Sequence, residues 1–383
     1  MFARPEGIEN CRIWIDGCFD FAHHGHAGAM LQARQLGKEL YVGVHSDEEI
    51  LLNKGPTVMK LDERITAVEA CKWSTKAIGD APYVTDPNFM DKFDCKYVVH
   101  GDDITTDANG EDCYQIVKDL GRFVVVKRTP NISTTDLVGR MLLMSKNHHF
   151  KSILSIDQSS KNPLLNEENI EKFKIYASDS TGLQSGSGVY YYYGDEKLNT
   201  LVEPSSRIAD INEIYYVDGG FDLFHPGHIE ILNLIRKDAE ASTNKVKIVV
   251  GIHDDSTINK VEGLNYPIMN ILERSLCTLQ CRYVDSTVLG VPYEPTTEFL
   301  NKLPGKVTRV YHGPTQTEGQ NQYKYVPKEL YHKVKGHKYD FMNTEFIVNR
   351  VLSNKAAYEE RQKRKGWKAE IENKLKEDES SKA

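Results

Sequence analysis

The sequence predicts an α/β protein in which one domain, built around a parallel sheet, occurs twice in tandem. An unusual run, Asp-Gly-Cys-Phe-Asp followed by His-His-Gly-His, begins at Asp16 and recurs from Asp218 as Asp-Gly-Gly-Phe-Asp followed by His-Pro-Gly-His. Around each copy, short β-branched and aromatic runs alternate with helical patterns, which is typical of a parallel sheet covered on both faces. We therefore expect one domain at 1–150, a linker at 151–211, a second domain at 212–352 and a charged helical tail at 353–383.

The elements follow the same order in both repeats. Strand patterns are short and mostly β-branched or aromatic, whereas helical patterns repeat their apolar residues every three or four positions. Ligands of such folds bind beyond the carboxyl ends of the strands, where the motifs of this chain fall. In the first repeat we expect strands at 12–16, 39–45, 96–100 and 122–128 and helices at 27–36, 61–73, 111–120 and 134–144; in the second, strands at 213–217, 245–253 and 307–312 and helices at 271–281 and from about 344.

The composition changes between the repeats and at the end of the chain. Residues 179–188 are rich in Gly and Ser, which is typical of a flexible linker, and the four tyrosines at 190–193 are expected to pack on a domain surface. In the tail, Trp367, Ile371 and Leu375 form an apolar stripe that is too narrow for a membrane-surface helix. We expect the tail to dock onto its own protein or to stay solvated.

Composition excludes several classes of function. A net charge of −7 gives no electrostatic basis for general nucleic-acid binding. No apolar run is long enough to span a membrane and no signal peptide is evident, so a cytoplasmic protein without stable membrane insertion is expected. The seven cysteines are scattered, which favours free thiols over disulfides or a cysteine-based metal site. Peripheral membrane contact and a homodimer stay open.

The His-x-Gly-His motif is the strongest candidate for chemistry. It opens a helix, whose free N–H groups and positive dipole end attract a phosphate, and Gly25 allows the backbone to approach closely. His23 and His26 can donate hydrogen bonds to charge that develops on a transferring phosphoryl group. The alternative is a structural or zinc-binding histidine pair, but no suitable cluster supplies a third zinc ligand. Repetition in the same strand-to-helix context favours phosphate chemistry.

Two further groups of polar residues follow strands. Lys54 lies in the loop after the second strand and can reach an α-phosphate as a mobile positive charge, although a loop lysine is often only solvated. Arg128 ends a strand, and the Ser/Thr-rich turn after it places Ser133 and Asp136 at capping-box spacing. The hydroxyls, N–H groups and guanidinium of this segment suit a β- or γ-phosphate, beyond the role of an ordinary helix cap.

Two other motifs are less specific. The stretch from His100 to Asp103 ends a strand, where it can contact a base or a metal-bound phosphate or simply form a turn. Glu63-Arg64 recurs as Glu273-Arg274, so Arg64 is either a fold-level ion pair or a ligand clamp.

The motifs together indicate nucleotidyl transfer. The chain has neither a Walker A sequence nor Gly-x-Gly-x-x-Gly, so a P-loop kinase and a dinucleotide dehydrogenase do not fit. No general base is evident. A phosphate monoester is already ionised and needs none, which points to transfer of a nucleotidyl group onto a phosphate.

These residues resemble the cytidylyltransferase branch of the nucleotidyltransferase superfamily over about 11–145 and 212–352, on the strength of Asp-Gly-x-Phe-Asp…His-x-Gly-His, Arg-Thr-x-x-Ile-Ser-Thr-Thr and the closing Arg140. The resemblance implies a Rossmann-like fold and, with two such domains in one chain, conversion of CTP and phosphoethanolamine to CDP-ethanolamine and pyrophosphate in phosphatidylethanolamine synthesis. Mg²⁺ would accompany CTP. The implied roles are catalysis for His23, His26 and Lys54; phosphate binding for Gly25, Arg128, Thr129, Ser133 and Thr134; the base and ribose side for Gly17, Phe19, His100, Gly101, Asp102 and Asp103; and phosphoethanolamine binding for Asp16, Tyr83 and Arg64.

The second copy departs from this pattern. Alignment puts Glu262 opposite Lys54, and Met342 and Asn343 opposite Ser133 and Thr134, while the remnant His225 and His228 survives. A carboxylate beside a triphosphate repels it, so we expect the second domain not to turn over. Other acceptors stay open, namely phosphocholine, glycerol phosphate, or a vitamin phosphate that receives an adenylyl group. A non-catalytic nucleotide-sensing scaffold is the alternative of another class.

Overall fold

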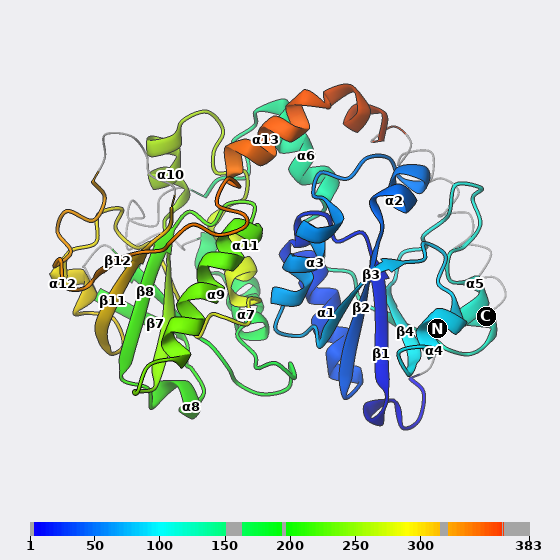
Figure 1. The fold of residues 1–383 in the computed structure, drawn as a ribbon, viewed down its shortest axis with the longest axis horizontal. Coiled ribbons are helices and arrows are strands. Elements are labelled where there is room, and N and C mark those ends of the chain that lie inside the picture. The colour runs from blue at the N-terminus through cyan, green and yellow to red at the C-terminus, as the bar shows by residue number, and fades with distance from the viewer. Residues whose placement is uncertain (1–3, 151–162, 194–196, 315–320, 362, 364–383) are drawn as a thin grey trace. The chain divides into compact units, whose positions relative to one another are not determined.

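The computed structural model describes residues 4–150, 163–193, 197–314, 321–361 and 363. They form two compact units (Figure 1). The first unit comprises residues up to Leu142 together with those from Ile347 onward, and the second comprises Leu143–Phe346. The tail stripe at Trp367, Ile371 and Leu375 lies outside the described residues.

The first unit contains a five-stranded parallel sheet in the order β3-β2-β1-β4-β5. The chain adds strands on one side of β1 and then returns to the other side with β4, which makes the β1/β4 junction the topological switch point where ligands of open α/β sheets bind. Its strands are β1 (Arg12–Gly17), β2 (Glu39–His45), β3 (Lys76–Ala81), β4 (Cys95–Gly101) and β5 (Phe123–Val126). Its helices are η1 (Ile8–Asn10), η2 (Asp20–Ala22), α1 (His24–Leu36), α2 (Asp47–Asn53), α3 (Leu61–Ala70), α4 (Pro87–Asp91), α5 (Gln115–Asp119) and α6 (Thr134–Leu143), whose last residue already belongs to the second unit.

The second unit repeats this plan and extends it. Its sheet has the order β12-β11-β8-β9-β10-β6-β7, in which the first five strands correspond to those of the first sheet and β7 is antiparallel to β6. Its strands are β6 (Gly188–Tyr193), β7 (Lys197–Val202), β8 (Glu213–Gly219), β9 (Val246–Ile252), β10 (Ser286–Leu289), β11 (Lys306–His312) and β12 (Tyr331–Lys333). Its helices are η4 (Pro163–Leu165), α7 (Glu167–Tyr176), α8 (Ser206–Ala209), α9 (Pro226–Glu240), α10 (Asp255–Glu262), α11 (Ile271–Leu279), α12 (Thr297–Leu300) and the start of α13 (Thr344–Ser353).

The predicted α/β fold with two tandem Rossmann-like domains is confirmed, with one addition. Because β7 runs antiparallel at the edge, the second sheet is mixed rather than purely parallel. The sequence patterns also missed β3, whose sequence Lys-Ala-Ile-Gly-Asp-Ala has a single β-branched residue, and the short helices α2 and α4.

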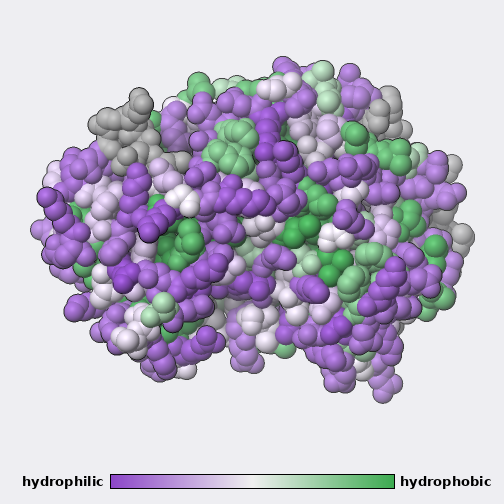
Figure 2. Space-filling model, viewed as in Figure 1, coloured by the Kyte–Doolittle hydropathy of each residue, from purple (hydrophilic) through white to green (hydrophobic). Residues whose placement is uncertain are grey.

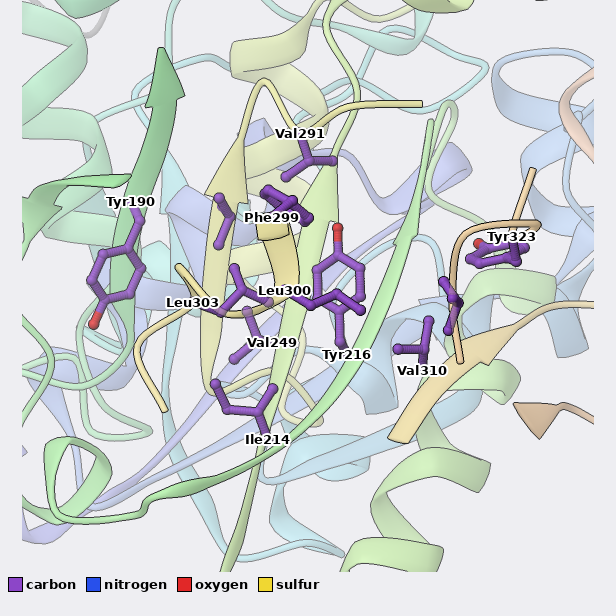
Figure 3. Packing of buried hydrophobic residues seen from close by; sticks show 12 residues of the cluster. Tyr190, Ile214, Tyr216, Val249, Val291, Phe299, Leu300, Leu303, Val310 and Tyr323 are labelled. Atoms are coloured by element: carbon purple, nitrogen blue, oxygen red, sulfur yellow. The ribbon is translucent and has the colours of Figure 1, made fainter. Parts of the chain in front are cut away.

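The predicted linker, for which a few ordered stretches were expected, is part of the second unit over the residues that the structure describes. Strand β6 pairs with β10 of the second sheet, and Tyr190 lies in the hydrophobic core beside residues of the other strands, such as Tyr216 and Val249 (Figure 3). The Gly/Ser-rich stretch is a tight turn, in which the Asp179 carboxylate accepts hydrogen bonds from the backbone N–H and hydroxyl of Thr181. Composition suggested flexibility, but burial of an aromatic side chain fixes the segment in the core.

The predicted domain ends also differ from the compact units. Residues 143–150 follow the first repeat in sequence but belong to the second unit, where the Phe150 N–H donates to the Asp255 carboxylate. Residues from Ile347 onward include the end of the second repeat and the tail but belong to the first unit, where Arg350 forms an ion pair with Glu63. Each repeat therefore ends in the other unit, because its last segment finds its buried polar partners there.

The face shown in Figure 2 is mostly hydrophilic, with separate hydrophobic patches. Within the described part of the chain, no helix combines the length and apolar character that crossing a membrane requires. All seven cysteines are free thiols.

Candidate active site

A cavity of about 500 Å³ lies at the carboxyl ends of β1 and β4, the switch point of the first sheet. It brings together residues from the four motifs that the sequence singled out, which are far apart along the chain. The predicted site residues that line it are Asp16, Gly17, Phe19, His23, Gly25, His26, Lys54, His100, Gly101, Asp103, Arg128, Thr129, Ser133 and Thr134. Arg64, Tyr83 and Asp102 were also predicted for the site but are not among the residues that line this cavity.

The two motif histidines are neutral and stacked. Their ring centroids lie 3.9 Å apart. Burial lowers the pKa of His23 well below its usual value, and the neighbouring His26 lowers it further. Burial also lowers the pKa of His26 to about 3. His23 caps α1, because its Nδ1 accepts a hydrogen bond from the Gly25 N–H at 3.1 Å. An accepting Nδ1 puts the proton on Nε2, which is buried without a protein partner and is therefore a donor ready for a ligand.

Close packing requires a glycine at position 25, in addition to the close approach of the backbone to a phosphate that the sequence suggested. A Cβ at this position would lie 2.7 Å from Cγ2 of Ile132 and 2.9 Å from the His23 ring. The glycine thus lets the loop before α6 pack directly against the His-x-Gly-His turn, which brings the Ser/Thr-rich segment to the histidines.

Lys54 ends α2, and its Nζ lies 5.5 Å from the centre of the Tyr83 ring. The loop after it is held by Asp20, a buried residue whose carboxylate accepts hydrogen bonds from the N–H groups of Val58 and Met59 at 3.0 and 2.8 Å. Asp20 is the second aspartate of the repeated Asp-Gly-x-Phe-Asp run, and Asp222 binds two N–H groups in the same way in the second unit. This recurrence is the sequence signal for the loop-binding role of Asp20, which is not among the site residues that the motifs predict.

The strand end at β4 is tied to Arg128. The Arg128 guanidinium contacts Asp103 at 3.1 Å, and its backbone N–H donates to Asp102 at 3.2 Å. Both side chains of the ion pair are about half exposed, so it is weak and can be exchanged for a stronger anionic ligand. His100 lies beside them with its pKa lowered by burial.

The hydroxyls before α6 already have protein partners. Ser133 forms the predicted cap with Asp136, whose N–H donates to the Ser133 hydroxyl at 3.1 Å. The Thr134 hydroxyl donates to the Asp20 carbonyl at 3.2 Å. These contacts fix the start of α6 at the cavity, which Arg128 also lines.

The three residues predicted to hold phosphoethanolamine have structural roles. Arg64 is fully buried, and its guanidinium donates to the carbonyls of Cys18, His45 and Met59. It also forms an ion pair with Asp47 at 2.7 Å, as Arg274 does with Asp255 in the second unit, which is the fold-level ion pair that the sequence left open. Tyr83 is buried and donates to the Thr106 carbonyl.

Asp16 does line the cavity, but its carboxylate is engaged by three protein donors. These donors are Trp14, Thr85 and Tyr114. A ligand ammonium at this edge of the cavity would therefore meet a carboxylate whose charge is already partly satisfied.

One residue that lines the cavity was missed because it lies outside both repeats. Arg361 comes from the C-terminal segment of the first unit. With Lys54 and Arg128 it gives the cavity three permanent cations against the carboxylates of Asp16 and Asp103. This excess of positive charge suits a polyphosphate.

The second unit has a corresponding cavity of about 610 Å³ with the opposite charge. His225 and His228 keep the geometry of the first pair, with ring centroids 3.8 Å apart and an accepting His225 Nδ1. Among the described residues that line this cavity there is no lysine or arginine, whereas the carboxylates are Asp218, Asp222, Glu262, Asp340 and Glu345. Burial raises the pKa of Glu262 and of Asp218 to about 7, and the negative charge of a bound polyphosphate would raise both pKa values further.

Comparison with known proteins agrees with this geometry. The cytidylyltransferase-like family matches residues 14–140 and 216–351. The chain is 41% identical over 363 residues to the ethanolamine-phosphate cytidylyltransferase of Dictyostelium discoideum, covering 92% of this chain and 94% of that protein. It is 38% identical over 367 residues to the ethanolamine-phosphate cytidylyltransferase of Mus musculus, covering 92% and 89%. Similarity to choline-phosphate cytidylyltransferase A of Mus musculus extends over 133 residues, which is 34% of this chain and 36% of that protein.

Proposed function

This chain belongs to the cytidylyltransferase-like family, and we propose that it transfers the cytidylyl group of CTP to phosphoethanolamine, giving CDP-ethanolamine and pyrophosphate. The observation that carries the proposal is the first cavity, in which two neutral histidines with an unpartnered donor lie in the same space as three cations. The relatives that align with nearly the whole chain supply the substrate class.

The reaction needs alignment and charge stabilisation rather than a general base. An oxygen of the phosphoethanolamine phosphate attacks the α-phosphorus of CTP, a new P–O bond forms, and the bond to the β-phosphate oxygen breaks with its electron pair leaving on pyrophosphate. The Nε2–H of His23 donates to the oxygens that become more negative at the α-phosphorus, and His26 lies beside it. Because both imidazoles are neutral, they stabilise this charge without giving up a proton.

The cations have separate tasks in this proposal. Lys54, at the end of α2, is the mobile charge that brings the acceptor phosphate to the α-phosphate. Arg128 exchanges Asp103 for the β- and γ-phosphates, beside the N–H groups at the start of α6. Holding both reactants in this way can supply several kcal/mol of the barrier reduction.

We propose that Mg²⁺ enters with CTP. The described residues contain no group of three or more His, Cys, Asp or Glu side chains placed to hold a metal ion. Mg²⁺ typically keeps several waters and binds through substrate phosphates and one or two carboxylates. Asp103, released when Arg128 turns to the nucleotide, is the carboxylate of this cavity that fits such a contact.

The second cavity is proposed to be non-catalytic. Its histidine pair is intact, but Glu262 replaces the lysine and no cation opposes the carboxylates among the described residues. The same charge balance makes a scaffold that senses nucleotides through this cavity unfavourable.

Phosphocholine is the second candidate acceptor. The choline-phosphate relatives align with about a third of the chain, whereas the ethanolamine-phosphate relatives align with nearly all of it, which favours the primary ammonium. We further propose a cytoplasmic location, supported by the free state of all seven cysteines.

Pyrophosphate release tests the proposal directly. The protein is incubated with Mg²⁺, either CTP or ATP, and one of four phosphomonoesters: phosphoethanolamine, phosphocholine, glycerol phosphate or a vitamin phosphate. Release with CTP and phosphoethanolamine at the highest kcat/KM supports the proposal. A higher kcat/KM for phosphocholine, for ATP or for another acceptor contradicts the substrate assignment, and no release with any pair contradicts the activity.

A further inference from the structure

The C-terminal segment of the first unit contacts the loop that follows Lys54. Three successive backbone carbonyls of this loop accept hydrogen bonds from three different side chains of the segment. Arg361 donates to Pro56 at 2.6 Å, Tyr358 to Thr57 at 3.0 Å and Arg350 to Val58 at 3.2 Å. A loop whose successive carbonyls are all bound from one side cannot move independently of that segment.

Arg350 anchors the segment to the fold. Its guanidinium makes a two-pronged contact with the Glu63 carboxylate at 2.6 and 2.7 Å. Glu63 is buried and also accepts from the Lys60 N–H at the start of α3, so it fixes the far end of the same loop. The ion pair is mostly buried, where such a geometry is stronger than on the surface.

Arg361 lies where the loop meets the cavity. Its Cβ would be 3.2 Å from a Cβ added at Gly55, a residue with φ +100°, so the arginine covers the residue directly after Lys54. The Arg361 guanidinium also lies 3.5 Å from Asp20, the carboxylate that binds the N–H groups of Val58 and Met59. The loop is thus bound through its N–H groups by the motif aspartate and through its carbonyls by the C-terminal segment.

The second unit uses the same kind of contact. There the segment after α6 supplies His148 and His149, whose Nε2 atoms both lie 2.8 Å from the Pro267 carbonyl. Pro267 precedes the N–H groups that Asp222 binds, as Pro56 and Thr57 do in the first unit. In both units, this loop is bound by a segment that comes after the sheet of the other repeat in the chain, so the contact is a recurring feature of the fold.

We infer that Tyr358 and Arg361 are positioning residues of the first site, which act by holding the Lys54 loop in the geometry that the transfer requires. The inference rests on the proposed function for its kinetic readout. It also assigns a role in the first site to the tail that follows the second repeat, because Tyr358 and Arg361 belong to the first unit.

A double-mutant cycle tests this role. Arg361→Ala in the full chain is expected to lower kcat about 10- to 100-fold, since a displacement of about 1 Å can cost about 10² in rate. In a Lys54→Ala background, the same substitution is expected to change kcat by less than about twofold, because the group on which it acts is gone. An equal loss in both backgrounds would overturn the inference, since Arg361 would then act independently of Lys54.

Three further variants exclude a general loss of structure. Tyr358→Phe removes one hydroxyl and is expected to lower kcat about three- to tenfold, with the same dependence on Lys54. Arg361→Lys keeps a cation that can reach the Pro56 carbonyl and is expected to recover part of the rate. The matched control is Lys363→Ala, which removes one charge from the exposed side of the same helical stretch and should stay within about twofold of the wild type.

Amide hydrogen exchange tests the inference in the absence of substrate. The N–H groups of Val58 and Met59 are expected to exchange faster in Arg361→Ala and Tyr358→Phe than in the wild type or in Lys363→Ala. Unchanged exchange in both variants would overturn the inference. If the wild type releases no pyrophosphate, the proposed function fails, and the exchange of these two N–H groups still tests whether the segment holds the loop.

Discussion

Paired alanine substitutions in the two His-x-Gly-His motifs separate catalysis from structure. His23 and His225 have the same local role, since each accepts a hydrogen bond on Nδ1 from the glycine two residues later, at 3.1 and 3.2 Å. Each also stacks on the second histidine of its motif, and each has a buried Nε2 without a protein partner. The first faces a cavity with three cations and the second a cavity lined by carboxylates.

The magnitudes follow from these contacts. Either substitution removes a helix cap, which costs about 0.5–2 kcal/mol of stability. Only His23→Ala also removes a donor aimed at the reacting phosphate, a loss that typically costs about 10²–10³ in kcat. We therefore expect similar decreases in thermal stability for His23→Ala and His225→Ala but a difference of at least about 100-fold in kcat.

The assay is pyrophosphate release with CTP and phosphoethanolamine at saturating substrate, together with thermal unfolding of each variant. Double variants with His26→Ala and His228→Ala extend the comparison to the whole motif. If His225→Ala lost as much kcat as His23→Ala at a temperature where both variants are folded, the second cavity would be catalytic and the reasoning from its charge would be refuted.

Three other substitutions test individual contacts. Gly25→Ala should destabilise the first unit by about 1–3 kcal/mol in denaturant unfolding, because its Cβ would lie 2.7 Å from Ile132; an unchanged midpoint would contradict the packing argument. Asp103→Asn removes the carboxylate proposed to contact Mg²⁺ and should therefore raise the KM for CTP, because releasing Arg128 from a half-exposed ion pair worth at most about 1 kcal/mol can offset that loss at most about fivefold; a lower KM would contradict the Mg²⁺ contact. Burial lowers the pKa of His228 from its ordinary value of 6.5 to about 3. Between these two values the unfolded chain binds a proton at His228 that the folded chain does not bind, so the free energy of unfolding decreases as the pH is lowered below 6.5. His228→Asn should therefore lose about 2 kcal/mol less than the wild type between about pH 7.5 and pH 5, measured as free energy of unfolding, and an equal loss would show that His228 is not held neutral.

Sequence reasoning located most of the first cavity because its residues fall at strand ends. His23, Lys54, His100 and Arg128 each follow or end a short apolar strand, and a parallel sheet brings such ends to one edge. It also assigned to phosphoethanolamine binding a residue, Arg64, whose contacts are with the protein itself. Arg64 has the residue type of a ligand clamp, but its burial among backbone carbonyls could be known only from the packed structure.

The prediction of a flexible linker at 179–188 differs from the structure for another reason. Gly and Ser are typical of flexible segments, yet a short turn between α7 and β6 uses the same residues. The decisive fact is the pairing of β6 with β10, a contact between segments about 100 residues apart that no local pattern carries.

The sequence by itself determined the α/β class, the duplication and which copy keeps the charges for a polyphosphate, since Lys54 against Glu262 is a difference in residue type alone. The tertiary structure decided where each repeat ends and what completes the first site. Arg361 meets Pro56 across 305 positions of the chain, and no local pattern marks that contact. The Asp20 carboxylate accepts from the Met59 N–H, and only the recurrence of the motif aspartate at Asp222 signals this contact in the sequence. Such long-range polar contacts arise because buried backbone groups must find partners wherever the folded chain provides them.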